Sequence, residues 1–184
     1  RIIRSAFEFA KNQKMTSVTC VHKASVLRVS DGLFLEIAQH IAQEYPEINL
    51  TSINVDAMCM SLLRKPHEYQ VIVAPNMYGD IVSDLAAQLV GGLGFGCSGN
   101  IGRHYAVFEP SHGSASRYAG KFKVNPIATI LAARMMLNWL GEIPMAAAVQ
   151  SAVSEVIREG QVRTYDMQGS ATTMEMAEAI AGKL

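Results

Sequence analysis

The spacing of apolar residues divides the first half of the chain into strand-like and helix-like segments. Short β-prone runs occupy residues 17–22, 50–55 and 70–74. The spacing of an amphipathic helix recurs at residues 1–14, 31–45, 56–64 and 79–90, so that each β-prone run is followed by a helix. Repeated strand-then-helix units are typical of an α/β fold with a largely parallel sheet, and we predict that class here.

Residues 91–102 are rich in glycine and interrupt the strand-then-helix pattern, so we expect a domain boundary near them. Beyond it the pattern predicts a strand at 105–108 and a polar loop at 109–124. A long helix follows that loop. Asn125 is a favourable cap for this helix, Pro126 suits its first position, and Gly141 ends it. Further helices are predicted at 144–160 and 170–184, which gives two structural units, 1–90 and 91–184.

Composition and charge limit the kinds of molecule that the protein is expected to bind. The 184 residues are 49% hydrophobic and 17% charged, enough apolar material for a packed core. Sixteen basic and sixteen acidic residues cancel, which removes the electrostatic reason to expect nucleic acid or an anionic membrane. We therefore expect a small-molecule ligand.

The cysteines and the absence of long apolar runs indicate a soluble protein in a reducing compartment. Cys20, Cys59 and Cys97 are scattered and odd in number, which favours neither a disulfide framework nor a zinc knuckle. No apolar run approaches the ~20 residues of a membrane span, and no signal-peptide pattern opens the chain. A cytoplasmic location is expected, or the mitochondrial matrix in a eukaryote.

The first residues already carry a helical stripe, with neither an initiator methionine nor a capping residue ahead of it. We expect that the chain is part of a larger protein.

Three carboxylates follow predicted strands and are candidates for a metal site. Asp80 and Asp84 are four residues apart on one predicted helix, which puts both on one face near its N-terminal end. Asp56 also opens a helix after a β-prone run. A hard divalent cation such as Mg²⁺ or Mn²⁺ would relieve their mutual repulsion. The alternative is that acids in a first helical turn complement the helix dipole and face water.

Lys23 follows the first predicted strand, beside His22. A lysine ammonium near a metal and apolar walls can exchange protons and act as a general base, although most lysines are solvated surface charges.

Two glycine-containing segments are candidates for binding a ligand, and the second is the stronger one. Gly94, Gly96 and Gly99 have the spacing of the dinucleotide fingerprint. That motif should follow a strand and open a helix, whereas here a helix precedes it, so we interpret these glycines as turn residues. In the loop 109–115 (EPSHGSA), small residues allow backbone amides to approach a ligand, His112 can stack or hydrogen-bond, and Arg117 can pair with a phosphate.

Taken together, these segments resemble the β-decarboxylating dehydrogenases, the family of isocitrate, homoisocitrate and 3-isopropylmalate dehydrogenases. The stretches that carry the resemblance lie in the same order over essentially the whole chain: 22–27 (HKASVL), 30–34 (SDGLF), 55–58 (VDAM), 76–84 (NMYGDIVSD), 91–94 (GGLG), 98–102 (SGNIG), 108–115 (FEPSHGSA), 119–121 (AGK) and 124–126 (VNP).

The resemblance implies the two-domain fold of that family, which is not a Rossmann fold, with only its C-terminal portion present. Residues 1–90 would be part of the smaller α/β domain that carries the dimer contacts and the metal site. Residues 91–184 would be the C-terminal part of the larger, cofactor-binding domain. The helices at 31–45 and 79–90 would pack against their mates in a dimer or larger oligomer with shared active sites.

The resemblance also implies roles for the residues already singled out. Asp80 and Asp84, with Asp56 of a second subunit, would bind Mg²⁺ or Mn²⁺ and the substrate's hydroxyl and carboxylate. Lys23, also from the second subunit, would help to remove the hydroxyl proton while hydride passes to the nicotinamide.

The cofactor's adenosine half would bind the residues of the 112–115 loop and the segments near it. The residues are His112, Gly113, Ser114, Ala115, Arg117, Tyr118, Asn125 and Tyr165. NAD-using members usually have an aspartate where this chain has Arg117, and Tyr165 falls where NADP-using isocitrate dehydrogenases place a tyrosine. A guanidinium suits a phosphate dianion, so we predict NADP rather than NAD.

The substrate is predicted less narrowly than the reaction. The stretch 22–23 and the segment 30–34 are most like isocitrate dehydrogenases, while homoisocitrate and 3-isopropylmalate dehydrogenases are the alternatives. A non-catalytic regulatory subunit of a hetero-oligomeric isocitrate dehydrogenase is the alternative of another class, and the presence of Lys23 and all three aspartates counts against it.

Overall fold

The computed structural model describes all residues, Arg1–Leu184, as two compact units, Arg1–Ala86 and Ala87–Leu184. The division falls within a helix, slightly before the boundary expected near Gly91. Each unit has its own hydrophobic core. None of the helices is both long and apolar enough to cross a membrane.

The first unit is built on a three-stranded parallel sheet with the strand order β2-β1-β3. The strands are β1 (Ser17–His22), β2 (Asn49–Asn54) and β3 (Val71–Val73). Four helices accompany them: α1 (Ile2–Asn12), α2 (Ser30–Ala42), α3 (Val55–Arg64) and α4 (Asn76–Leu89), with a 3-10 turn at Pro66–Glu68. The predicted parallel α/β arrangement is thus confirmed in this unit.

The central strand β1 is buried on both faces of the sheet, which explains its continuous apolar sequence. Val18 and Cys20 face a core formed with α1 and α2, whose centre is the fully buried Phe7 stacked on Tyr45. Val21 faces a second core formed with α3 and α4. Packing of α1 and α2 on one face and of α3 and α4 on the other therefore fixes the position of β1 and of its end.

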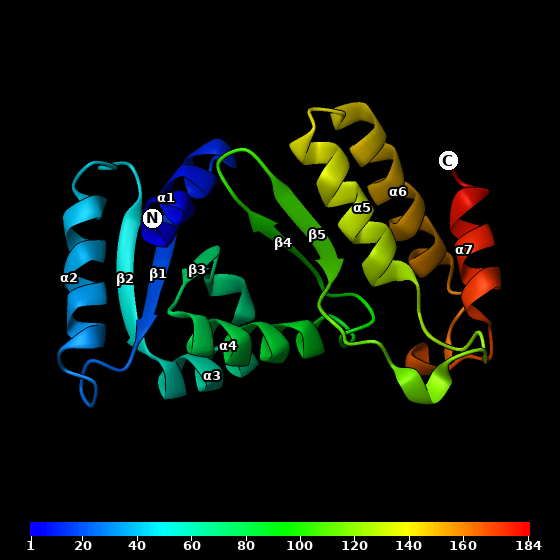
Figure 1. The fold of residues 1–184 in the computed structure, drawn as a ribbon, viewed down its shortest axis with the longest axis horizontal. Coiled ribbons are helices and arrows are strands. Elements are labelled where there is room, and N and C mark those ends of the chain that lie inside the picture. The colour runs from blue at the N-terminus through cyan, green and yellow to red at the C-terminus, as the bar shows by residue number, and fades with distance from the viewer. The chain divides into compact units, whose positions relative to one another are not determined.

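The second unit combines a two-stranded antiparallel sheet with three helices. Its strands are β4 (Cys97–Ile101) and β5 (Ala106–Pro110). Its helices are α5 (Ile127–Trp139), α6 (Ile143–Glu159) and α7 (Thr173–Ala181), with 3-10 turns at Ser116–Tyr118 and Tyr165–Met167. In Figure 1, α5 and α6 run side by side, and they share a core with α7 around Ile127, Val153 and Met176.

Strand β4 was missed by the sequence interpretation, which treated the glycines of 91–102 as turn residues. Gly99 instead lies within β4, opposite Phe108 of β5. A Cβ atom at Gly99 would lie only 2.9 Å from the sulfur of Met135 on α5. A side chain at this position would have to displace the end of Met135, and such a tertiary contact leaves no signal in turn propensity.

Helix α4 also begins earlier than predicted, at Asn76 rather than Gly79. Its first turn holds no acidic residue, so Asp80 and Asp84 lie in later turns. The dipole explanation for these two acids therefore fails, because the favourable charge interaction is confined to the first turn. Asp56, by contrast, lies in the first turn of α3, where both a metal-binding role and an interaction with the helix dipole remain open.

Candidate functional site

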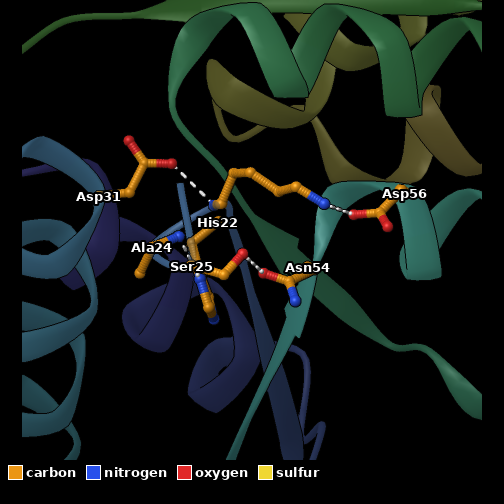
Figure 2. A network of polar contacts seen from close by, with 7 residues as sticks. His22, Ala24, Ser25, Asp31, Asn54 and Asp56 are labelled. Atoms are coloured by element: carbon orange, nitrogen blue, oxygen red, sulfur yellow. Dashed lines mark hydrogen bonds and ion pairs between the residues drawn. The ribbon is translucent and has the colours of Figure 1, made fainter. Parts of the chain in front are cut away.

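Parallel pairing of β1 with β2 brings Lys23 and Asp56 together. His22 pairs with Asn54 at the end of the two strands, so the residues that follow emerge at the same sheet edge. There the Lys23 ammonium donates a hydrogen bond to Asp56 Oδ1 and forms an ion pair with it (Figure 2). The carboxyl edge of a parallel sheet is where α/β proteins collect ligand-binding groups.

The ion pair leaves Asp56 accessible to a ligand. The Asp56 side chain is 67% exposed and that of Lys23 is 28% exposed. The hydrogen bond from Lys23, followed by the backbone amide of Asp56 itself, holds the pKa of Asp56 below its ordinary value. Asp56 therefore stays ionised, which a cation-binding carboxylate requires.

A tight turn after β1 fixes the backbone of Lys23. Its amide donates to Asp31 Oδ2 at 2.7 Å, and its carbonyl accepts from the amides of Val26 and Leu27, each at 2.9 Å. The amide of Ala24 donates to His22 Nδ1 at 3.1 Å. Lys23 is thus held at its backbone by Asp31 and at its ammonium by Asp56, and Figure 2 marks these two contacts with dashed lines at the labelled aspartates.

Asp80 and Asp84 lie on the exposed face of α4, opposite its buried residues Tyr78 and Val82. The single chain does not bring three potential metal ligands together. That Asp56 joins Asp80 and Asp84 from a second subunit stays a prediction of the sequence analysis.

The faces that carry these acids are also apolar. On α3, Met60 and Leu63 follow Asp56 at the helical spacings i+4 and i+7 and are 65% and 62% exposed. On α4, Met77 and Ile81 alternate with the two acids at helical spacing and are 61% and 50% exposed. Two helices of the same unit thus each expose a stripe that mixes large apolar side chains with candidate ligands.

The second unit contains a pocket of about 160 Å³ that gathers most of the predicted cofactor residues. The predicted residues in its wall are His112, Ala115, Tyr118, Asn125 and Tyr165. The pocket is also lined by Leu93, Gly94, Val124 and Asp166, which the sequence interpretation did not select. Ala115 has φ 48, a left-handed conformation that costs energy for any residue with a Cβ and often marks a ligand-binding loop.

Two aromatic rings and a lysine adjoin the pocket. The rings of Tyr118 and Tyr165 lie 5.5 Å apart between centroids, and the Lys123 ammonium lies 4.8 Å from the Tyr165 ring. A hydrogen bond with Tyr118 raises the pKa of Tyr165, which keeps its hydroxyl protonated. Flat aromatic walls of this kind suit a heteroaromatic ring such as a purine.

Asp166 organises the pocket floor. It accepts from Asn125 Nδ2 at 3.0 Å and from the hydroxyl of Thr164, while Asn125 Oδ1 accepts from the amide of Ile127 at the start of α5. A Cβ at Gly94 would lie 2.6 Å from Asp166 Oδ2, so any side chain there would displace the Asp166 carboxylate. Gly94 therefore lines the pocket, although it does not belong to a dinucleotide fingerprint.

Three predicted cofactor residues lie outside the pocket wall. Gly113, Ser114 and Arg117 are exposed, and Arg117 forms none of the hydrogen bonds or ion pairs within the chain. Its guanidinium is accordingly free to meet a ligand. Asp166 could have been noticed from its place directly after Tyr165, whereas Leu93 and Val124 carry no sequence signal.

The remaining buried nucleophile is not part of either site. Burial raises the pKa of the Cys20 thiol to about 11, so it stays protonated within the core.

Comparison with known proteins identifies the family. The family model for isocitrate/isopropylmalate dehydrogenase matches residues 1–180. The chain belongs to this family. It is 47% identical to the 3-isopropylmalate dehydrogenase of Archaeoglobus fulgidus over all 184 residues, which cover 56% of that protein. It is 44% identical to the probable isocitrate dehydrogenase [NAD] subunit alpha, mitochondrial, of Drosophila melanogaster, covering 100% of the chain and 49% of the relative.

The solved structures agree with the fold. The crystal structure of isocitrate dehydrogenase from Methylococcus capsulatus matches with a TM-score of 0.96 and 45% identity, over 98% of this chain and 54% of that one. The chain spans about half the length of the curated relatives it matches. The predicted family and its α/β fold are thus confirmed, and the relatives differ in their named substrates.

Replacing Lys23 with methionine is expected to raise the pKa of Asp56 toward its ordinary value, because the largest cause of the lowering is removed. The folded-state pKa lies below the unfolded one, so the stabilisation by the pair is present above the unfolded pKa and is lost as the pH falls through the folded pKa. Carboxyl ¹³C NMR titration of the metal-free protein measures the change.

Lys65→Met is the matched control, because Lys65 pairs with Glu68 instead. It should raise the pKa of Glu68 and leave that of Asp56 where it is. An unchanged Asp56 pKa in the Lys23 variant would contradict the ion pair.

Proposed function

We propose that the complete protein catalyses the metal-dependent oxidative decarboxylation of isocitrate to 2-oxoglutarate with reduction of NADP. The observation that carries this proposal is the pairing of the Lys23 ammonium with Asp56 at the carboxyl edge of the sheet. It provides a proton-transfer group beside an exposed, ionised carboxylate, the combination that oxidation of a metal-bound hydroxyl requires.

The acids fit a hard divalent cation, because all three are exposed carboxylates and oxygen ligands suit Mg²⁺ or Mn²⁺. When bound, such a cation acts as a Lewis acid on the substrate's hydroxyl and on the enolate left by decarboxylation. Asp80 and Asp84 would hold it from one chain, and Asp56 from another. Lys23 would lie beside the substrate hydroxyl and, as the neutral amine, help to remove its proton, and the contact with Asp56 holds its Nζ at the sheet edge.

A second copy of the chain completes this arrangement. The stripes on α3 and α4 expose Met60, Leu63, Met77 and Ile81, and burial of such side chains is the main favourable term in association. Because the stripes also carry the aspartates, their burial in a dimer would bring the acids to the interface. We therefore assign the dimer contact to α3 and to α4, the latter being the helix expected at 79–90; the contact expected for the helix at 31–45 stays a prediction.

The pocket in the second unit fits the adenosine half of a dinucleotide. His112, Tyr118 and Tyr165 supply flat and polar contacts for the base, and the exposed Arg117 supplies a cation for a 2′-phosphate. Lys123 adds a second positive charge beside the tyrosines. When bound, the cofactor accepts the hydride. Neither Arg117 nor Lys123 forms an ion pair with a carboxylate of the chain, so both can pair with a 2′-phosphate, which favours NADP. The Drosophila relative, by contrast, is named for NAD.

Isocitrate is the favoured substrate because residues 22–23 and 30–34 are most like isocitrate dehydrogenases. Homoisocitrate and 3-isopropylmalate are the alternatives, and the latter is the named substrate of the Archaeoglobus relative. The presence of Lys23 with Asp56, Asp80 and Asp84 favours a catalytic chain over a regulatory subunit.

Replacing Asp80 and Asp84 together with alanine is expected to abolish Mn²⁺ binding by the full-length protein. Loss of outer-shell partners alone weakens metal sites by about 10–100-fold, so loss of two ligands should raise the dissociation constant by more than about 100-fold. Isothermal titration with Mn²⁺ measures it. Replacing the exposed Gln88 of the same helix with alanine is the control and should bind normally. Retained binding in the double variant would rule out this metal site.

The cofactor and the substrate are tested together by measuring kcat/KM for isocitrate, homoisocitrate and 3-isopropylmalate, each with NADP and with NAD. Isocitrate with NADP should give the highest value, and Arg117→Ser should lower kcat/KM for NADP by about tenfold or more while changing that for NAD little. Arg103→Ser, an exposed arginine outside the pocket, is the control. A preference for NAD in the unaltered protein would overturn the cofactor assignment.

A further inference from the structure

Asp31 is a buried carboxylate without a cationic partner. It is only 5% exposed and takes part in none of the chain's ion pairs. Burying a carboxylate is costly unless hydrogen bonds satisfy it, so a residue of this kind needs a reason for its place. Its neighbours are all neutral donors.

Those donors come from three separate elements. The backbone amide of Lys23, just after β1, donates to Asp31 Oδ2 at 2.7 Å. The hydroxyl of Ser30, at the start of α2, donates to Oδ1 at 3.2 Å. The hydroxyl of Tyr78, near the start of α4, adjoins the Asp31 carboxylate, and burial together with this carboxylate raises the pKa of Tyr78. One side chain therefore joins the turn that carries Lys23 to the helix that carries Asp80 and Asp84.

We propose that Asp31 is a positioning residue that fixes the backbone of Lys23 and, through Tyr78, the first turn of α4. This inference rests on the proposed function, since it concerns the geometry of the groups assigned there. The Lys23 side chain is long and flexible, and its ammonium is aligned only if its Cα is held. Asp56 anchors one end of that side chain and Asp31 anchors the other (Figure 2).

A neutral amide holds the Lys23 amide less strongly than this carboxylate does. Asp31 accepts at both oxygens, whereas asparagine offers one oxygen acceptor and one NH₂ donor. In Asp31→Asn, the Ser30 hydroxyl has to turn and accept from the NH₂ group, and the bond from the Lys23 amide loses its charge assistance, so the hold on the turn weakens.

The test compares Asp31→Asn and Tyr78→Phe with Glu36→Gln in the full-length protein. Glu36 is an exposed acid on the same helix α2, so its variant removes an equal charge without disturbing the hydrogen bonds described. Asp31→Asn should lower kcat by about tenfold or more, since displacement of a reacting group by about 1 Å costs up to about 100-fold. KM for the substrate should stay within about twofold, because binding contacts are retained.

A second measurement reports directly on the hydrogen bond between the Lys23 amide and Asp31. Hydrogen exchange of the Lys23 amide should accelerate by about tenfold or more in Asp31→Asn, while the amides of Val18 and Cys20 in β1 keep their protection. Tyr78→Phe retains the Asp31–Lys23 bond, so Lys23 exchange should change little and kcat should fall less. If Asp31→Asn does not fold, Asp31→Glu, which keeps the charge but displaces the acceptor oxygens, should give the same loss of kcat with substrate KM retained.

The outcomes separate the two proposals. Unchanged kcat and unchanged Lys23 exchange in Asp31→Asn, or equal effects of Glu36→Gln, would overturn the positioning role. If the unaltered protein oxidised none of the three 2-hydroxy acids, the proposed function would fail, and the exchange of the Lys23 amide would still decide whether Asp31 holds the turn.

Discussion

The parallel register between β1 and β2 is the constraint on which the candidate active site depends. Pairing of His22 with Asn54 makes both strands end at the same level, so that Lys23 and Asp56 leave the sheet side by side. A shift of the register by one residue would turn these side chains to opposite faces and separate the ammonium from the carboxylate. The register is in turn fixed by burial of β1 on both faces, with Val18 and Cys20 in one core and Val21 in the other.

The two units divide the chemistry between them. Under the proposed function, the first unit supplies the proton-transfer lysine and the three carboxylates, and a second copy packs on the exposed apolar stripes of α3 and α4. The second unit holds an aromatic pocket whose floor is organised by Asp166 and Asn125. The proposed division of the metal site between chains accounts for a single chain that does not bring Asp56 together with Asp80 and Asp84. It also gives a reason for large apolar side chains to stand exposed next to charged ones.

The sequence predicted the fold class and the order of the elements because buried strands and amphipathic helices leave clear periodic patterns. The range of β1 was predicted as observed, and α3 and α6 within a residue or so. Strand β4 was missed because Gly99 is there to admit Met135 of α5, a tertiary contact without a local signal. For the same reason Asp31 was overlooked: its role depends on a bond to Lys23 eight residues earlier and on Tyr78 in a distant helix. Of the predicted cofactor residues, His112, Ala115, Tyr118, Asn125 and Tyr165 line the pocket, whereas Gly113, Ser114 and Arg117 lie outside its wall.

The central claim is that each active site combines Lys23 and Asp56 of one chain with Asp80 and Asp84 of another. Subunit complementation tests it most directly, using a Lys23→Met protein and an Asp80→Asn/Asp84→Asn protein, each inactive alone. After co-expression in equal amounts, half of the dimers are hybrids with one intact site in two, so about one quarter of the unaltered activity should return. If hybrid dimers form, as native mass spectrometry would establish, and the mixture stays inactive, the site lies within a single chain and the account is wrong.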